Sequence, residues 1–281
     1  MRPVSTPAQK ALWFIESHFA ENITLDDVAA CAGVSRFHLA RAFESSMGCS
    51  AIRYMRERRL TEAARRLAKG APDILNLALE MGYGPHEAFT RAFRDQFGVT
   101  PEQVRTRGTV DDLKLKEPIK MTENTVLPQT RTRLETSQAR LIAGLSQRYT
   151  CENSAGIPSQ WQRFLPNFGH VPGQVGRIAY GVSYNQDEQG NFDYLCGIEV
   201  KDFAKLPTEF DRVRVPEHKY LVFTHEGHIS GIRATWNSIW NQWLPQSGLQ
   251  LADGPFLERY DETFDPQTGF GGVEIWIPVK E

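Results

Sequence analysis

The stretch FTRAFRDQFG, residues 89–98, repeats with small changes the stretch LARAFESSMG, residues 39–48. Both contain Arg-Ala-Phe at the same place, and both end in glycine. In each copy the large apolar residues recur every four positions, which is the spacing of one face of an α-helix. We therefore expect two equivalent helices, each buried along one apolar stripe. The stripes are Leu39, Phe43 and Met47 in the first copy, and Phe89, Phe93 and Phe97 in the second.

A shorter helix and a glycine turn are predicted before each copy. Thr24 is placed to cap a short helix that ends at Gly33, and Ser35 to cap the longer helix that follows. In the second copy Gly82 occupies the place of Gly33, with one residue added to the turn. A short helix, a glycine turn and a longer helix make a helix–turn–helix unit, so the sequence predicts this unit twice.

Three further helices complete the expected helical domain. They begin after Thr6, after Ser50 and after Thr100, where proline or a capping side chain favours a helix start. The longest of the three, AIRYMRERRLTEAARRLAKG, lies between the two helix–turn–helix units and would hold them apart rigidly. Two recognition helices held in this way can enter successive major-groove segments, about 34 Å apart. One chain would then bind a long, asymmetric DNA site.

The charge of the chain is divided unevenly. The net charge is −2, but residues 1–107 hold 15 Lys and Arg against 12 Asp and Glu, and the remainder holds 17 against 22. Most cations of the first part are arginines, which suit phosphate and guanine contacts better than lysines do. The alternative is a helical protein–protein module with solvated arginines. The matched glycine turns and matched arginines of the two copies favour DNA binding over that alternative.

Residues 8–107 resemble the DNA-binding domain of the AraC/XylS transcription regulators. The resemblance lies in DDVAACAGVSRFHLARAFESSMG, in YMRERRLTEAARRL and in ALEMGYGPHEAFTRAFRDQFGVTPEQVR. It implies an all-α, homeodomain-like fold with two helix–turn–helix units. The base-reading residues that it implies are Phe37, Ala40 and Arg41 on the first recognition helix, and His86, Glu87, Ala88 and Arg91 on the second. As phosphate contacts we expect Arg36, Arg53 and Arg94.

The chemistry of these positions suggests what each can recognise. Arg41 and Arg91 can each bind the O6/N7 edge of a guanine. The resemblance implies a glutamine at position 87, where this chain has Glu87; a carboxylate can accept from cytosine N4 but repels phosphates. Ala40 and Ala88 can contact only a thymine methyl group.

A second domain of different texture follows. Residues 108–125 are polar and are expected to form a linker between domains 1–107 and 126–281. Beyond it, β-forming stretches and helical stretches recur in the order strand–helix–strand–strand, twice. The expected architecture is an α+β domain of two such repeats, joined through their sheets with a crease between them. This domain is similar to the GyrI-like effector-binding domain, and the order of the two domains resembles that of Rob-type regulators.

A ligand site is expected in the crease. The resemblance places Glu258, in the strand segment PFLERYDE, as a buried acid that faces a ligand. Glu274, which alternates with Ile275 in its strand segment, is a second candidate. An unpaired buried carboxylate is costly, so it favours a cationic or hydrogen-bond-donating guest. Aromatic rings suit such guests, although many of them serve only as core. The candidate rings are Tyr149, Trp161, Tyr180, Tyr194, Trp236, Trp240 and Trp276.

Other chemistry is disfavoured. The motif HEGH at residues 225–228 spaces its histidines three apart, unlike the metalloprotease motif HExxH, so no metal site is expected. The four cysteines form no CxxC pair, and Cys151 has no neighbouring cation in sequence, so we expect reduced, unreactive thiols. There is no signal-like apolar block at the start and no apolar run of about 18 residues, which indicates a cytoplasmic chain.

The sequence therefore predicts a DNA-binding transcription regulator that is not an enzyme, needs no cofactor and does not enter a membrane. Its expected partners are a double-stranded promoter site, RNA polymerase and a small amphipathic, aromatic or cationic ligand. Activation in a multidrug or stress response is the expected role. Two alternatives remain for the rear domain: a scaffold for protein partners, and a hydrolase-like domain that acts on a small molecule.

Overall fold

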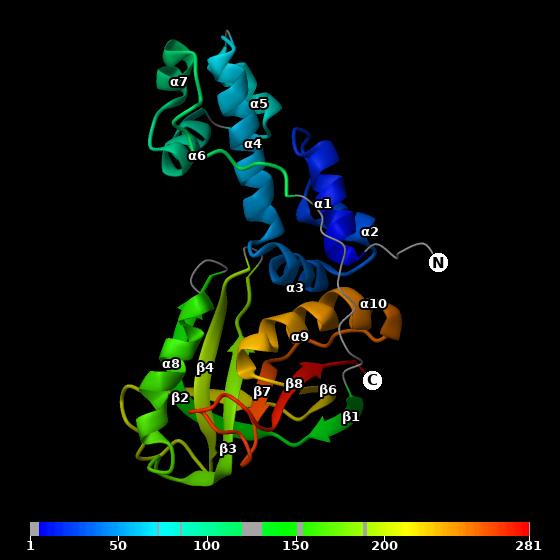
Figure 1. Cartoon of the computed structure of the whole chain (residues 1–281), viewed down its shortest axis with the longest axis vertical. Coiled ribbons are helices and arrows are strands. Elements are labelled where there is room, and N and C mark those ends of the chain that lie inside the picture. Colours follow the sequence, from blue (N-terminus) through cyan, green and yellow to red (C-terminus); the bar gives the residue numbers. More distant parts are fainter. Residues whose placement is uncertain are drawn as a thin grey trace. The chain divides into compact units, whose positions relative to one another are not determined.

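The computed structural model describes residues 6–71, 73–84, 86–119, 131–150, 154–187 and 190–280. The chain divides into two compact units, Met1–Glu123 and Asn124–Glu281. Unit 1 is helical, and unit 2 combines a sheet with helices (Figure 1). Cys151 lies outside the described residues, and so do the side chains of His86 and Glu87.

Unit 1 has the predicted helices, and their starts lie at the predicted caps. The side chains of Thr24, Ser35, Ser50 and Thr100 each accept a hydrogen bond from a backbone N–H in the first turn of the helix that follows. The helices are α1 Pro7–His18, α2 Leu25–Ala32, α3 Arg36–Met47, α4 Ala51–Ala68, α5 Ile74–Glu80, α6 His86–Phe97 and α7 Pro101–Arg107.

Two helix–turn–helix units share α4. The first is α2–α3 and the second is α5–α6, and the turns contain Gly33 and Gly82 with φ of 72° and 76°, a conformation that favours glycine. Each unit has its own core on a different part of α4. The first core includes Leu39, Phe43 and Tyr54, and the second includes Leu60, Leu67, Phe89 and Phe93. The predicted apolar stripes are confirmed.

An ion pair inside unit 1 uses one of the arginines of α4. The Arg58 guanidinium donates from Nε to Oε1 of Glu16 at 2.8 Å and from Nη2 to Oε2 at 3.0 Å. Tyr54 donates to the same Oε1 at 2.6 Å. The side chain of Arg58 is 5% exposed, so this arginine joins α4 to α1 inside the unit and is not a surface cation.

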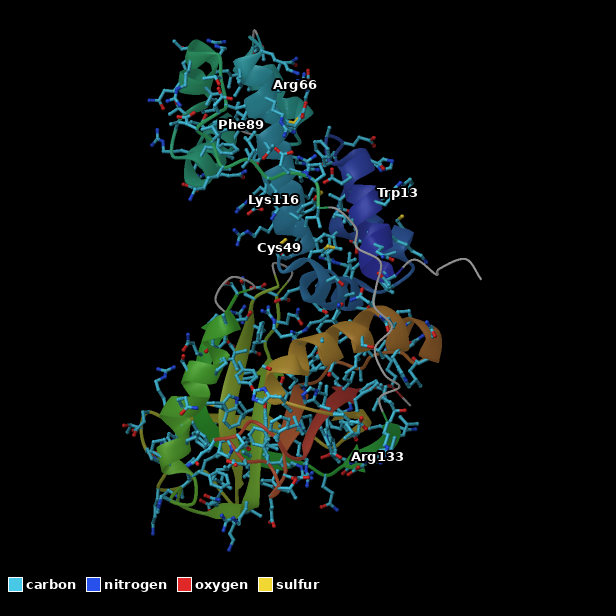
Figure 2. All side chains as sticks on the ribbon, in the orientation of Figure 1. Trp13, Cys49, Arg66, Phe89, Lys116 and Arg133 are labelled. Carbon is cyan, nitrogen blue, oxygen red and sulfur yellow. The ribbon has the colours of Figure 1, made fainter. Side chains whose placement is uncertain are left out.

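The segment that follows α7 lies against the same helix. The backbone oxygen of Lys116 accepts from Arg58, and its N–H donates to Thr61; Figure 2 shows Lys116 beside α4. The N–H of Ile119 donates to the hydroxyl of Tyr54, and Leu115 packs on the second core. Residues 108–119, which we expected to be linker, are therefore part of unit 1.

Unit 2 is built on one antiparallel sheet in the order β1-β6-β8-β7-β3-β4-β2-β5. Its helices are α8 Ile157–Phe164, α9 Ile232–Ser238 and α10 Leu244–Ser247, the last two joined by a π-helical turn, Ile239–Trp243. The strands are β1 Thr132–Ser137, β2 Arg140–Tyr149, β3 Gln174–Tyr184, β4 Phe192–Val200, β5 Asp211–Val215, β6 His218–His225, β7 Phe256–Tyr260 and β8 Val273–Pro278.

The strand order confirms the predicted repeat and adds two exchanged strands. The repeats are β2-α8-β3-β4 and β6-α9-β7-β8, and they meet where β3 pairs with β7. β1 precedes the first repeat but pairs with β6 of the second, and β5 precedes the second but pairs with β2 of the first.

These exchanges require a strongly curled sheet. Ser137 at the end of β1 and Arg140 at the start of β2 are three residues apart, which spans at most about 11 Å. Yet six strand spacings separate β1 from β2 in the sheet order, roughly 29 Å if the sheet were flat. The connection from Val215 to His218 makes the same demand from the other edge. The two edges must approach each other, so the sheet encloses a core of its own.

In the part of the chain that the structure describes, no helix combines the length and the apolar character required to cross a bilayer.

Candidate functional sites

The first recognition helix, α3, holds its predicted residues with different degrees of exposure. Arg36 is exposed and lies 3.4 Å from Asp26, an open ion pair that a phosphate can replace at little cost. Phe37 and Arg41 are half-buried. Ala40 is 6% exposed, so it has little surface for the predicted contact with a thymine methyl group.

The second recognition helix, α6, leaves its cations exposed. Arg91 and Arg94 are exposed, and neither makes an ion pair with another described residue. Ala88 is half-buried. Since the stripe of Phe89 and Phe93 is fully buried, both arginines lie on the face of α6 that does not contact the core.

The charge of Arg53, the third predicted phosphate contact, is compensated by a carboxylate within unit 1. Its Nε donates to Glu57 at 2.7 Å, one turn along α4. Lys116 Nζ lies 3.4 Å from the same carboxylate. A phosphate at Arg53 would therefore compete with an existing ion pair.

In unit 2, the register of the sheet defines a row of side chains on the helix-covered face. Residues paired directly across neighbouring strands share a face. Cys196, Gly181, Glu258, Ile275 and Phe223 form such a row across β4, β3, β7, β8 and β6. At its ends the row meets α8, through Cys196 Sγ and the Gln160 carbonyl, and the π-helical turn, through Phe223 and Trp243. Glu258 thus lies where the two repeats join, on the face that both helices cover.

Three aromatic side chains donate to the Glu258 carboxylate. Oε2 accepts from the Tyr194 hydroxyl at 2.7 Å and from the Tyr260 hydroxyl at 3.0 Å. Oε1 accepts from the Trp236 indole N–H at 3.0 Å. Trp161 donates in turn to the Tyr194 hydroxyl at 3.0 Å. These five residues, Glu258, Tyr194, Tyr260, Trp161 and Trp236, are called the Glu258 site.

Both tyrosine hydroxyls of the Glu258 site remain protonated and can donate hydrogen bonds. Burial, and then the charge of Glu258, raise the pKa of Tyr194 well above its ordinary value, and the same two causes raise the pKa of Tyr260. The hydroxyls therefore stay protonated at any physiological pH. Among the described residues, no lysine or arginine pairs with Glu258, so the site is an anion surrounded by aromatic rings and neutral donors.

Family comparison identifies the two parts of the chain. The model of the GyrI-like small molecule binding domain matches residues 130–280, more than half of the chain. The chain belongs to the GyrI-like family. A helix–turn–helix domain model matches residues 28–107.

Two relatives align with this chain over nearly its whole length. Transcriptional regulator Rob of Salmonella typhimurium is 28% identical, and the right origin-binding protein of Escherichia coli strain K12 is 27% identical; each alignment covers 96% of both chains. Probable transcription factor PqrA of Proteus vulgaris is 40% identical over 33% of this chain and 75% of that protein. The chain is a DNA-binding transcription regulator of the AraC type with a GyrI-like domain.

Three of the residues predicted to line the ligand crease do not lie with Glu258 in the GyrI-like domain. Trp276 pairs with Leu257, and Tyr180 pairs with Arg259, so both point to the opposite face of the sheet. They belong to the core that the curled sheet encloses. Glu274 is on that face too, where Arg133 lies 2.7 Å from it.

The other predicted rings lie on the face of Glu258 but differ in access. Trp161 and Trp236 are half-buried, and Tyr194 is 2% exposed. Tyr149 is fully buried beside Tyr194, at 6.4 Å between ring centroids, and has no contact with the carboxylate. Trp240 is 2% exposed and stacks on the ring of Trp236, so it holds that ring in place and offers little surface to a ligand.

Sequence analysis missed Tyr260. It follows Glu258 by two residues, and alternate residues of a strand share a face, so the segment ERY contained the signal. The ring of Tyr260 packs edge-on against Trp161 at 5.0 Å.

Two other features of the GyrI-like domain, a hollow and the HEGH motif, lie apart from the Glu258 site. A hollow of about 350 Å³ is lined by none of the predicted ligand residues; its lining is Thr136, Glu217, His218, Lys219, Ala252, Val279 and Lys280. The ring of His225, from the HEGH motif, bonds to Thr235 and to the His228 carbonyl. No group of three or more potential metal ligands occurs within the described ranges.

Proposed function

We propose that this regulator binds an asymmetric DNA site as a single chain, with α3 and α6 in successive major-groove segments. The observation that supports this most strongly is that both helix–turn–helix units pack on the single helix α4, each through its own core. A continuous helix keeps the two recognition helices at one fixed spacing. Because the two helices carry different side chains, the two half-sites that they bind differ in sequence.

Arginine substitutions test this proposal. Arg41→Ala and Arg91→Ala should each weaken binding to the preferred site by about 1–3 kcal/mol and relax base preference in one half-site only. Arg94→Ala, one helical turn from Arg91 on the exposed face, should weaken binding to all sequences alike and reduce the salt dependence. Competition binding with single-base variants of the site measures both effects. Uniform weakening by Arg41→Ala and Arg91→Ala would show that they contact only phosphates.

We propose further that the regulator activates transcription by contact with RNA polymerase. A chain bound to an asymmetric site has one fixed orientation toward the promoter, so one defined surface faces the polymerase. Inverting the site at constant distance should abolish activation in a purified transcription assay. A protein that only blocks the promoter would be indifferent to the inversion.

For the GyrI-like domain we propose that the Glu258 site binds a small organic cation with an aromatic or amphipathic body. The supporting observation is an anionic carboxylate, half-buried among Trp161, Trp236 and two tyrosines, with no cation paired to it among the described residues. Ring faces attract cations, and the attraction increases where water is excluded. The partial exposure of Glu258 supports ligand binding over the alternative of a scaffold for protein partners.

A matched pair of ligands tests the charge. Glu258→Gln should weaken binding of a cationic aromatic compound by roughly tenfold or more, and binding of its neutral isostere by much less. Glu199→Gln serves as a control, because Glu199 pairs with Arg140 at 2.6 Å and is not part of the Glu258 site. If Glu258→Gln weakened binding of both ligands equally, the charge of Glu258 would not contribute to ligand recognition.

A further inference from the structure

Counted over the residues that the structure describes, the Glu258 carboxylate has one acceptor position left. An ionised carboxylate offers about four lone-pair positions, two on each oxygen. Tyr194 and Tyr260 occupy both positions on Oε2. Trp236 occupies one of the two positions on Oε1. A guest can therefore make one good hydrogen bond to this carboxylate, and only to Oε1.

The two hydroxyls on Oε2 are held in place. Tyr194 is 2% exposed and accepts from Trp161, which fixes the orientation of its hydroxyl. Tyr260 is 8% exposed, and its ring lies between Trp161 and Phe264, at centroid distances of 5.0 and 4.9 Å. A guest that displaced either hydroxyl would leave a buried donor without a partner, which is costly.

We propose that the Glu258 site selects organic cations that present a single N–H, such as a protonated tertiary amine, over guanidinium and amidinium groups. This inference rests on the proposed ligand function of the site. A guanidinium binds a carboxylate through two parallel hydrogen bonds, one to each oxygen. Since Oε2 is already saturated, the second bond is not available. The remaining N–H groups of the guanidinium would be desolvated among rings without partners.

A quaternary ammonium is the opposite case. It keeps the positive charge and its contacts with Trp161 and Trp236 but has no N–H for Oε1. It should bind, and more weakly than the tertiary amine, by the contribution of one charge-assisted hydrogen bond. The site therefore ranks three cations of equal charge by their donors alone.

Three probes that share one phenylbutyl body test this ranking on the full chain by calorimetry. They are the protonated dimethylamine, the trimethylammonium and the guanidinium. We expect the dimethylamine to bind roughly tenfold more tightly than either of the others. Tyr260→Phe frees one position on Oε2 and should shift the ratio of the two dissociation constants toward the guanidinium, again by roughly tenfold.

Two further variants make the test specific. Tyr194→Phe frees the other position on Oε2, so we expect the same shift in the ratio of dissociation constants. This variant provides the test if Tyr260→Phe does not fold. Tyr149→Phe is the matched control: this tyrosine is fully buried on the same face, and its hydroxyl has no hydrogen-bond partner among the described residues. It should leave the ratio unchanged.

The outcomes separate this inference from the function on which it rests. If no probe binds, or if Glu258→Gln changes nothing, the ligand function itself is contradicted. If the probes bind through Glu258 but the quaternary ion equals the tertiary amine, the selectivity is contradicted and the ligand function stands. If neither Tyr260→Phe nor Tyr194→Phe changes the ratio of the dimethylamine and guanidinium dissociation constants, the selectivity is likewise contradicted and the ligand function stands.

Discussion

Gly181 lies directly opposite Glu258 where β3 pairs with β7, and a methyl group at position 181 would approach within 2.1 Å of the Tyr194 hydroxyl. It would also lie 3.0 Å from Glu258 Oε2. The missing side chain at position 181 is therefore what allows Tyr194 to reach the carboxylate across the join between the two repeats.

Gly181→Ala should accordingly damage both stability and the Glu258 site. We expect a loss of about 1–3 kcal/mol in the free energy of unfolding, as for overpacking in a core. Urea unfolding measures it. Gly231→Ala is the control, because the nearest atom to its added methyl group would be 3.6 Å away, an ordinary contact; it should change stability by at most about 0.5 kcal/mol. Equal effects of the two substitutions would contradict the packing that we describe.

Loss of the buried ion pair between Arg58 and Glu16 should reduce stability more than loss of the exposed pair between Arg65 and Glu117. Arg58→Ala removes both arginine hydrogen bonds and leaves the Glu16 carboxylate, whose side chain is 23% exposed, with the Tyr54 hydroxyl as its donor, so we expect a loss of about 3 kcal/mol. Arg65→Ala breaks a pair with Glu117, whose side chain is 64% exposed, and should cost at most about 1 kcal/mol. Thermal unfolding of the two variants gives the comparison, and similar losses would show that burial does not decide the difference.

The segment after α7 should stabilise the DNA-binding unit. A fragment that ends at residue 119 keeps the bonds from Lys116 to Thr61 and from Ile119 to Tyr54, and a fragment that ends at residue 107 loses them. Each bond contributes about 1 kcal/mol, so the longer fragment should unfold at a higher urea concentration. Both fragments should bind DNA if the helices alone form the reading surface. Identical unfolding midpoints would show that residues 108–119 add nothing.

Acid should weaken unit 2 through Glu274. Burial opposes ionisation of this carboxyl, but hydrogen bonds from Arg133 and Trp276 and the charges of Arg133 and Arg259 outweigh it and lower its pKa below the ordinary value. A lowered folded-state pKa means that the stabilisation is present above about pH 4.5 and is lost as the pH falls through the folded-state value.

The variant Glu274→Gln isolates this contribution. It should be less stable than the wild type at pH 7 by about 1 kcal/mol, and the difference should shrink as the pH falls toward 3. Urea midpoints of both proteins across this range measure the difference. A difference that stays constant or grows in acid would contradict the assigned sign.

The sequence predicted unit 1 almost completely, because its signals are local. Thr24, Ser35, Ser50 and Thr100 are caps whose effect extends over one turn, and the apolar stripes follow directly from helical spacing. What it did not predict was the role of Arg58, because its partner Glu16 is 42 residues away and charge alone does not distinguish a DNA contact from an internal ion pair.

In unit 2 the repeat was predictable and the pairing was not. The exchanged strands β1 and β5 bond to strands of the other repeat, which no local pattern specifies. The predicted ligand residues depended on the same information. Whether Trp276 shares a face with Glu258 depends on the register of β8 against β7. A shift of one residue in that register would place Trp276 on the same face as Glu258.

We propose that one chain reads two different half-sites at a fixed spacing. The decisive experiment is selection of bound sequences from a random duplex pool, with the full chain at a stated salt concentration. We expect one asymmetric motif with two half-sites about one helical turn apart, and Arg91→Ala should erase base preference in one half only. A palindromic motif would show that two chains bind together, and a motif that covers a single half-site would show that α3 and α6 do not read DNA together.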